Sequence, residues 1–378
     1  MYFDHAATTP IAPEVLKSME PWLREQFANP SSIYQPGQVA RAAVDEARMT
    51  IADFLGCKPT EIFFTSSGTE SCNWALRGLI ERKIVDGKPI HLIVSAIEHS
   101  AVLEMAKHLE KLYSLEVTYL PVDQEGVVEL KALDQALRPE TALVSIMTVN
   151  NEVGTIQPIH EIGKLCKERG VYFHTDACQA AGLLDLKVDD LKVDLLTVNA
   201  GKIYGPKGVG LLYIREGVQI DPWTVGGGQE FRMRAGTENV AGIVGFGKAI
   251  ELVQANRSAS DRLEELRNDL WELLQKTISG IHLNGSLEKR APNNLNIFFE
   301  GIDGENVVRR LDLMGIYVST GSACASGTVE PSHVLLALGL SPEAAKSSLR
   351  ITLGRQTTRE EIQELAKKMA EVVEALRN

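Results

Sequence analysis

The sequence predicts an α/β fold: a large domain with a mostly parallel, seven-stranded sheet flanked by helices, and a smaller α+β domain. Three observations carry this prediction. Strand-like apolar runs alternate with amphipathic helical stretches from about residue 61 to 215, the pattern changes to long charged helices past Val240, and 378 residues exceed what one hydrophobic core usually organises. Such alternation favours parallel strands joined by crossover helices.

The predicted strands of the large domain are short apolar runs that end at polar or turn residues. They cover residues 62–65, 90–96, 115–121, 142–149, 171–175, 194–198 and 209–214. Helical stretches at 101–112, 130–137 and 159–169 lie between them.

The last third of the chain predicts the smaller domain. After the charged helices, which run to about residue 276, come a strand at 294–299, a helix near 305–314, strands at 317–320 and 349–353, and a final helix from Thr358. No repeat or low-complexity linker interrupts the chain. We expect a large domain over residues 15–250, and a small domain formed by 1–14 with 251–378.

Composition narrows the class of protein. A net charge of −11 argues against nucleic acid as a partner. No run of eighteen apolar residues and no N-terminal signal region occur, so we expect a cytoplasmic protein with no membrane contact. The cysteines, at positions 57, 72, 166, 178 and 324, form no C-x-x-C pair, which argues against a metal site and a disulfide framework.

Polar residues follow several predicted strands, and ligands of a parallel sheet bind at these carboxyl ends. Gly68 and Thr69 lie after the first strand, where the start of a helix suits a phosphate group. The alternative is a Ser/Thr helix cap with a capping-box glutamate. His99 follows the second strand; it suits stacking on a flat ligand or proton transfer, but also a helix cap.

Two further strand ends carry an amide and a carboxylate. Asn150 and Asn151 offer donors to a ring oxygen, or shape a turn. Asp176 ends an apolar strand, where its desolvated carboxylate needs a cation. A protonated pyridine nitrogen is such a cation; the alternative is a helix N-cap.

Lys202 stands in a Gly/Pro turn, residues 201–208, directly after an apolar run. An amine that reacts at neutral pH must lose its proton, which requires desolvation and a neighbouring cation, for which Lys207 is the candidate. The alternative is a pair of solvated turn lysines. An amine, a ring-nitrogen carboxylate, a phosphate site, an amide and a stacking histidine together match the needs of pyridoxal phosphate.

Two later segments bear on the reaction. Cys324 lies in a run of small residues, 320–328, which suits a loop that carries a nucleophilic thiol. Arg350 stands within an apolar strand and suits bidentate binding of a substrate carboxylate. Residues 242–248 match part of a P-loop, but Ala249 replaces the magnesium-binding Ser or Thr and the segment reads as a helix, so we expect its glycines to allow close packing.

Over almost its whole length the chain resembles the group I (NifS-like and IscS-like) cysteine desulfurases, which are fold-type I pyridoxal phosphate enzymes of the class V aminotransferase family. The resemblance rests on ordered motifs at residues 4–10, 29–32, 69–71, 98–99, 150–154, 176 with 179, 202–208, 226–230, 234 with 236–237, 321–324, and 350 with 354–355. The serines and histidine that usually precede the lysine are replaced by Asn199, Ala200 and Gly201.

The resemblance implies a role for each site residue. Lys202 forms the internal aldimine, Arg350 anchors the carboxylate of L-cysteine, and Cys324 takes the sulfur as a persulfide, leaving alanine. The cofactor ligands that it implies, Asn151 also serving the substrate, are Asp176 for the ring nitrogen, Asn151 and Gln179 for the ring oxygen, His99 for stacking and proton transfer, Gly68 and Thr69 for the phosphate, Asn199 at a family phosphate-binding position, and Thr237 from a second subunit.

The resemblance also implies a homodimer and a sulfur-acceptor or iron–sulfur scaffold protein as a partner. Alternatives on the same fold are a selenocysteine lyase and a small-amino-acid aminotransferase, although a cysteine in a small-residue loop argues against the latter. The replaced residues 199–201 raise a different class, a non-catalytic sulfur carrier or scaffold partner.

Overall fold

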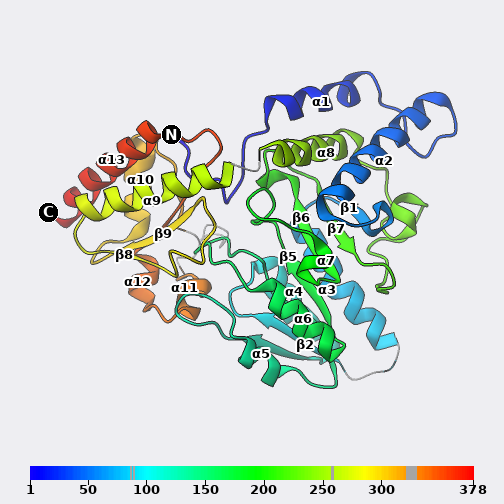
Figure 1. Cartoon of the computed structure of the whole chain (residues 1–378), viewed down its shortest axis with the longest axis horizontal. Coiled ribbons are helices and arrows are strands. Elements are labelled where there is room, and N and C mark those ends of the chain that lie inside the picture. Colours follow the sequence, from blue (N-terminus) through cyan, green and yellow to red (C-terminus); the bar gives the residue numbers. More distant parts are fainter. Residues whose placement is uncertain (86, 88–89, 257–258, 321–329) are drawn as a thin grey trace.

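The computed structural model describes residues 1–378 except 86, 88–89, 257–258 and 321–329. Its larger sheet has the strand order β1-β7-β6-β5-β4-β2-β3 (Figure 1). The strands are β1 (Ile62–Thr65), β2 (His91–Ser95), β3 (Glu116–Leu120), β4 (Thr141–Ser145), β5 (Tyr172–Asp176), β6 (Leu195–Asn199) and β7 (Gly210–Ile214). Only β7 runs antiparallel to its neighbours, which confirms the predicted, mostly parallel sheet.

Strand β4 is shorter than the predicted strand at 142–149. It ends at Ser145, after which the chain turns back on itself: Val149 forms an isolated bridge with Ile156, and the Gln157 amide donates to the Thr148 carbonyl at 2.9 Å. Residues on both sides of this end are buried. Hydropathy therefore could not separate the strand from the buried turn that follows it.

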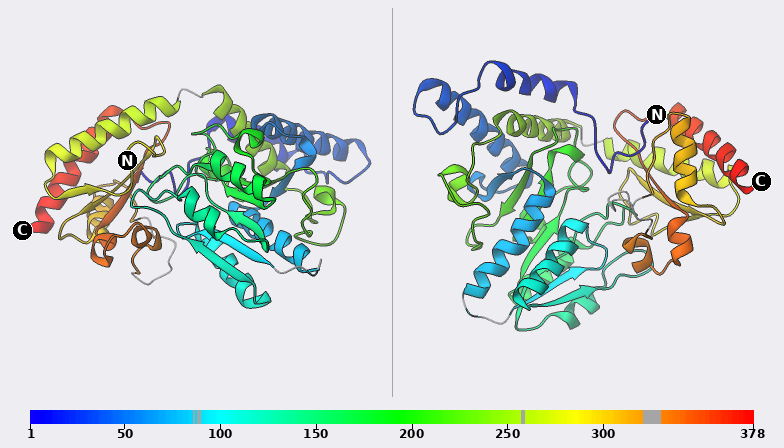
Figure 2. Two further views of the ribbon diagram at one scale, coloured as in Figure 1. Left: turned by 60° about the horizontal axis from the view of Figure 1, so that its bottom comes forward. Right: turned by 180° about the vertical axis from the view of Figure 1, so that it is seen from behind.

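Helices cover both faces of the larger sheet (Figure 2). One hydrophobic core packs α2 (Gln35–Leu55), α6 (Ile159–Arg169) and α8 (Val240–Ala255) against one face. A second packs α3 (Gly68–Val85) and α4 (Ser100–Tyr113) against the other. The remaining helices of this part are α1 (Pro13–Arg24), α5 (Leu130–Ala136) and α7 (Val188–Leu191).

The glycine-rich segment 242–248 lies inside α8 and serves helix packing, as predicted. A Cβ on Gly245 would lie 2.7 Å from the Met19 sulfur of α1, and one on Gly247 would lie 2.9 Å from Cβ of Ala47 in α2. Contacts this short exclude larger side chains, so the glycines let α1 and α2 approach α8 closely.

A smaller antiparallel sheet of β8 (Ile281–Leu283), β9 (Asn294–Phe299) and β10 (Ser348–Thr352), in the order β10-β9-β8, has its own hydrophobic core. Its helices are α9 (Ala259–Thr277), α10 (Gly304–Leu313), α11 (His333–Ala337), α12 (Pro342–Lys346) and α13 (Arg359–Arg377). Among the described residues, no helix has the length and apolar character needed to cross a membrane.

The predicted strand at 317–320 forms only isolated bridges, from Tyr317 to Tyr2 and from Ser319 to Arg350. The first of these bridges ties the N-terminus to the smaller sheet, and Asp4 forms a second bridge to Thr352. From there the chain crosses to α1 above the larger sheet (Figure 1). We call residues 4–9 the N-terminal strap.

Candidate active site

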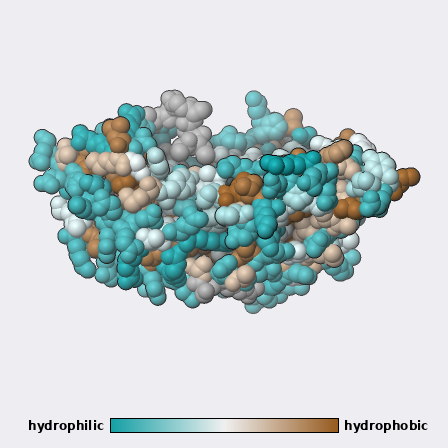
Figure 3. All heavy atoms as spheres, turned by 90° about the horizontal axis from the view of Figure 1, so that it is seen from above, coloured by the Kyte–Doolittle hydropathy of each residue, from teal (hydrophilic) through white to brown (hydrophobic). Residues whose placement is uncertain are grey.

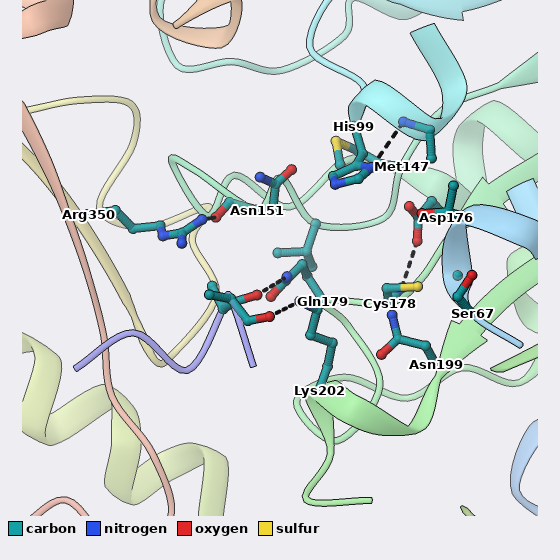
Figure 4. Close-up of a pocket in the computed structure, with 16 residues that line it drawn as sticks. Ser67, His99, Met147, Asn151, Asp176, Cys178, Gln179, Asn199, Lys202 and Arg350 are labelled. Atoms are coloured by element: carbon teal, nitrogen blue, oxygen red, sulfur yellow. Dashed lines mark hydrogen bonds between the residues drawn. The ribbon is translucent and has the colours of Figure 1, made fainter. Parts of the chain in front are cut away.

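A cavity of about 260 Å³ lies at the carboxyl ends of the parallel strands, beside β10 of the smaller sheet (Figure 4). Most of the site residues predicted from the sequence line it. They are Gly68, Thr69, His99, Asn151, Asp176, Gln179, Asn199, Lys202 and Arg350. Figure 4 shows Asp176 and Arg350 on opposite sides, with Lys202 reaching up between them.

The predicted phosphate site is the turn from β1 into α3, which begins at Gly68. A Cβ on Gly68 would lie 2.7 Å from Sγ of Cys178 and 3.0 Å from Nδ2 of Asn199, so only glycine leaves this end of the cavity unstrained. The capping alternative is realised here as well, because Oγ of Ser67 accepts from the Glu70 amide at 3.1 Å. The cap and the proposed phosphate site share one turn.

Glu70 of this turn is held by Arg234. The carboxylate pairs with the guanidinium at 2.5 Å and accepts from the Ser66 amide at 2.8 Å. Burial works to raise the pKa of Glu70, but the hydrogen bonds from Arg234 and Ser66 lower it. The charged carboxylate thereby ties the start of α3 to the segment around residue 234.

Asp176 ends β5 with only 8% of its surface exposed. One oxygen accepts from the Cys178 amide at 2.9 Å, and a turn rather than a helix follows, so the helix N-cap alternative is wrong. No ion pair involving Asp176 is formed among the described residues. A buried carboxylate at a cavity wall with no protein cation paired to it suits a cationic ligand atom.

Lys202 follows β6 in a single 3₁₀ turn, η2 (Ala200–Lys202), and its Nζ donates to the Ala7 carbonyl at 2.5 Å. Burial lowers the pKa of this amine, and the positive charge of Arg350 lowers it further. The neighbouring cation is thus Arg350 of the smaller sheet, and the prediction of Lys207 was wrong. Lys207 instead faces a separate hollow beside Tyr2 and Glu361.

His99 caps α4, which confirms the capping alternative, and it also lines the cavity, where its stacking and proton-transfer role stays a prediction. Its Nδ1 accepts from the Ala101 amide at 3.1 Å, so the ring proton of the neutral form is assigned to Nε2.

Cys178 lines the same cavity. Burial raises the pKa of its thiol well above the usual range, which fits the inert role expected for it.

The wall opposite Asp176 is formed by Arg350 and by two residues with amide side chains, Asn151 and Gln179. Arg350 is 4% exposed and donates from Nη1 to the Asn151 carbonyl at 2.8 Å and from Nη2 to Oδ1 of Asp4 at 2.8 Å. Nε2 of Gln179 donates to the Ala6 carbonyl at 2.9 Å (Figure 4).

Thr237 is a predicted site residue that does not line this cavity. Thr237 lies on an exposed stretch, which accords with its expected position in the site of a second subunit without testing it. Cys324 lies outside the described residues. Sequence reasoning, in turn, gave no role to the N-terminal strap, although Ala6 and Ala7 line the cavity. The motif at residues 4–10 was visible, but nothing local places it beside residues 170 to 350 positions away.

The family model for class-V aminotransferases matches residues 1–365. The chain belongs to the class-V aminotransferase family. Curated relatives include "Cysteine desulfurase IscS" of Dictyoglomus turgidum, 50% identical over 100% of this chain and 95% of its own length, and the protein of that name from Methanosarcina thermophila, 50% identical over 100% and 93%.

Solved structures agree with this assignment. A "NifS-like protein" superimposes with a TM-score of 0.93 at 39% identity, and each chain is covered completely. A second structure, "SspA in complex with cysteine", gives 0.83 at 38% identity over 94% of this chain and 99% of its own. The predicted fold class and the predicted family are confirmed.

Pyridoxal phosphate is the cofactor of this member of the class-V aminotransferase family, as the sequence predicted. The cavity fits it in three respects. Asp176 presents a buried carboxylate without an ion pair, the buried Oδ1 of Asn199 has no hydrogen-bond partner among the described residues, and Gly68 keeps space open at the start of α3. Asp176 would hold the ring nitrogen of the cofactor, and Asn199 and Gly68 would hold its phosphate end.

Proposed function

We propose that this chain is a cysteine desulfurase that converts L-cysteine to L-alanine and receives the sulfur on Cys324 as a persulfide. The observation that carries the proposal is that the desolvated amine of Lys202 and the buried guanidinium of Arg350 line one cavity. An amine for the cofactor and an anchor for a carboxylate are what an amino-acid substrate requires. The relatives named cysteine desulfurase support cysteine as that amino acid.

When bound, pyridoxal phosphate supplies a conjugated ring that withdraws electron density from the substrate carbon next to the amine. Arg350 binds the carboxylate through the second N–H groups of its terminal nitrogens, since the contacts to Asn151 and Asp4 use one N–H of each. The lowered pKa favours the uncharged Lys202 amine, which is the form that can accept a proton. Nε2–H of His99 is a donor beside the same cavity.

Cys324 completes the reaction in this proposal. Its thiolate forms a bond to the substrate sulfur while the carbon–sulfur bond breaks, and the electron pair of that bond stays with the substrate carbon. Protonation of this carbon gives the methyl group of alanine. A small-residue loop suits this role because the thiol has to approach the substrate and then deliver the sulfur. The acceptor, a carrier or iron–sulfur scaffold protein, stays a prediction.

The test compares two cysteine variants. The wild type should be yellow, lose its visible band on borohydride reduction, and release alanine and sulfide from L-cysteine with a reductant present. Cys324→Ala should keep the band and lose sulfide release. The matched control is Cys57→Ala, because burial raises the pKa of Cys57 to about 12 and its thiol stays protonated at neutral pH. A Cys324→Ala protein that releases sulfide at the wild-type rate refutes the assigned nucleophile.

The proposed active form is a homodimer in which Thr237 of each chain reaches the phosphate site of the other. Large apolar side chains support a protein partner: Phe27, Ile33 and Val225 are 87%, 94% and 92% exposed. Figure 3 shows hydrophobic side chains in brown at the end of the molecule that α1, α2 and their connection form. A dimer would cover this surface.

Light scattering measures the mass, and a cofactor titration measures the role of Thr237. We expect twice the chain mass for the wild type. Thr237→Ala should keep that mass but bind pyridoxal phosphate about tenfold more weakly, since a hydrogen bond to a charged group is lost. A monomeric, fully active wild type would refute this arrangement.

A further inference from the structure

The N-terminal strap connects the two parts of the molecule that face each other across the cavity. On the smaller sheet, the Thr352 amide donates to the Phe3 carbonyl at 2.8 Å, and the Ala6 amide donates to Oγ1 of Thr352 at 2.9 Å. On the larger sheet, the Thr9 amide donates to the Gly201 carbonyl at 3.0 Å. Both ends of the strap are therefore fixed by backbone hydrogen bonds.

Asp4 lies at the anchored end of this strap and pairs with Arg350. Oδ1 of Asp4 is 2.8 Å from Nη2, and the side chains are 20% and 5% exposed. On the other terminal nitrogen, Nη1 donates to the Asn151 carbonyl at 2.8 Å. One partner would let the guanidinium swing about its long side chain, whereas two partners on different nitrogens fix its plane.

The two contacts leave part of the guanidinium edge for a ligand. The contacts to Asn151 and Asp4 use one N–H on Nη1 and one on Nη2, each terminal nitrogen carries a second N–H, and Arg350 lines the cavity (Figure 4). Asp4 also balances the charge of Arg350, so the pair as a whole attracts an anion less than a lone arginine would. What Asp4 contributes to carboxylate binding is therefore orientation rather than attraction.

We propose that Asp4 is a positioning residue that holds Arg350 in the orientation in which it binds the substrate carboxylate. This inference rests on the proposed function, because it takes Arg350 as the carboxylate anchor. The strap makes Asp4 suitable for this role. Because the backbone of Asp4 is paired to the strand that carries Arg350, the two side chains keep their relative position.

Two substitutions at Asp4 separate orientation from charge. Asp4→Asn keeps an oxygen that can accept from Nη2 but removes the negative charge, so KM for L-cysteine should stay at or below the wild-type value. Asp4→Ala removes the acceptor and should raise KM about tenfold with kcat within about twofold of wild type. The matched control is Asp269→Ala, which removes a partner of Arg359, 2.7 Å away, at a more exposed site of the smaller sheet's helices.

Ligand binding gives a readout that does not depend on turnover. 3-Mercaptopropionate carries the carboxylate and thiol of cysteine without the amine, whereas cysteamine carries the amine and thiol without the carboxylate. Calorimetry with the holoenzyme should show that Asp4→Ala weakens binding of 3-mercaptopropionate about tenfold and leaves cysteamine unchanged. Asp269→Ala should change neither ligand.

Three results would overturn the inference: unchanged binding of both ligands by Asp4→Ala, equal weakening of both, or tighter binding of 3-mercaptopropionate by both Asp4 variants. The second would mean that Asp4 only supports the strap, and the third that only its charge matters. A wild-type protein that releases no alanine from L-cysteine refutes the proposed function, whereas these outcomes in an active enzyme refute only the role of Asp4.

Discussion

A buried ion pair between Arg48 of α2 and Glu230 gives the sharpest stability prediction. The two side chains are 3% and 2% exposed, and they meet through two hydrogen bonds of 2.7 and 2.9 Å. Glu230 also accepts from the Phe64 amide at 2.8 Å, and Arg48 lies over the rings of Phe64 and Phe231 at 4.7 and 5.1 Å. The charges therefore have no access to water and depend on each other.

Glu230→Gln removes one charge and leaves Arg48 buried without a counter-ion. Breaking such a pair costs about 3–5 kcal/mol, because the desolvation of the remaining charge is no longer compensated. The pair also anchors three consecutive residues in the left-handed region, Glu230, Phe231 and Arg232, with φ of 43°, 55° and 69°. The left-handed conformation costs each of these residues roughly 1 kcal/mol or more of backbone strain, so losing the anchor lets this segment relax.

The assay is denaturant unfolding of the holoenzyme at fixed pyridoxal phosphate, supported by thermal unfolding. Glu230→Gln should lose about 3–5 kcal/mol of unfolding free energy, or roughly 5–10 °C in Tm. Cofactor affinity should also fall, because Arg234, which holds Glu70 at the start of α3, lies just beyond the released segment. The control is Glu216→Gln, which removes a pair with Lys58 that is more than half exposed and should leave stability nearly unchanged.

The double variant Arg48→Met/Glu230→Leu provides the decisive comparison. It removes both charges, so it should recover most of the stability that Glu230→Gln loses, since no buried charge is left unpaired. If Glu230→Gln unfolds within about 1 kcal/mol of the wild type, or if the double variant is less stable than Glu230→Gln, the reasoning from desolvation is refuted.

Two further predictions concern Gly68 at the cavity and the buried Glu98. Gly68→Ala places a methyl group 2.7 Å from Sγ of Cys178 and should weaken pyridoxal phosphate binding at least about tenfold in a spectral titration, whereas Gly228→Ala, with nothing within 4 Å, should leave it unchanged. Burial raises the pKa of Glu98 from 4.5 to about 8, so the folded state binds more protons than the unfolded state between these values, and this group's contribution to stability falls as pH rises from about 4.5 to 8. The stability difference between wild type and Glu98→Gln should therefore shift against the wild type between pH 5 and pH 8, and a difference independent of pH would contradict it.

The larger sheet was predictable from sequence because its strands are short apolar runs separated by helical periodicity. The site followed from the same pattern: parallel strands end at one edge, so residues after β1, β2, β5 and β6 had to converge. The predicted end of β4 was wrong, because the apolar residues after Ser145 are buried in a turn and are not paired in the sheet. The prediction for Lys207 was also wrong, because adjacency in sequence does not show which way a turn directs a side chain.

The contacts of the strap had no local signal at all. Asp4 and Arg350 are 346 positions apart, and a carboxylate near the N-terminus looks like any exposed charge in the sequence. Only the paired backbones of the strap and β10 bring them together. Long-range ion pairs of this kind depend on how two sheets are oriented, which periodicity and motif spacing do not encode.

Three polar groups at the cavity have no partner within the part of the chain that the structure describes. Oδ1 of Asn199 and Nε of Arg350 are buried without hydrogen-bond partners among the described residues, and Asp176 has no ion-pair partner there. Each unsatisfied group costs about 1–3 kcal/mol, and a ligand that pairs with it would offset this cost. Asp176 and Asn199 lie at strand ends of the larger sheet and Arg350 lies in the smaller one, so cofactor and substrate bound together should stabilise the junction that the strap spans.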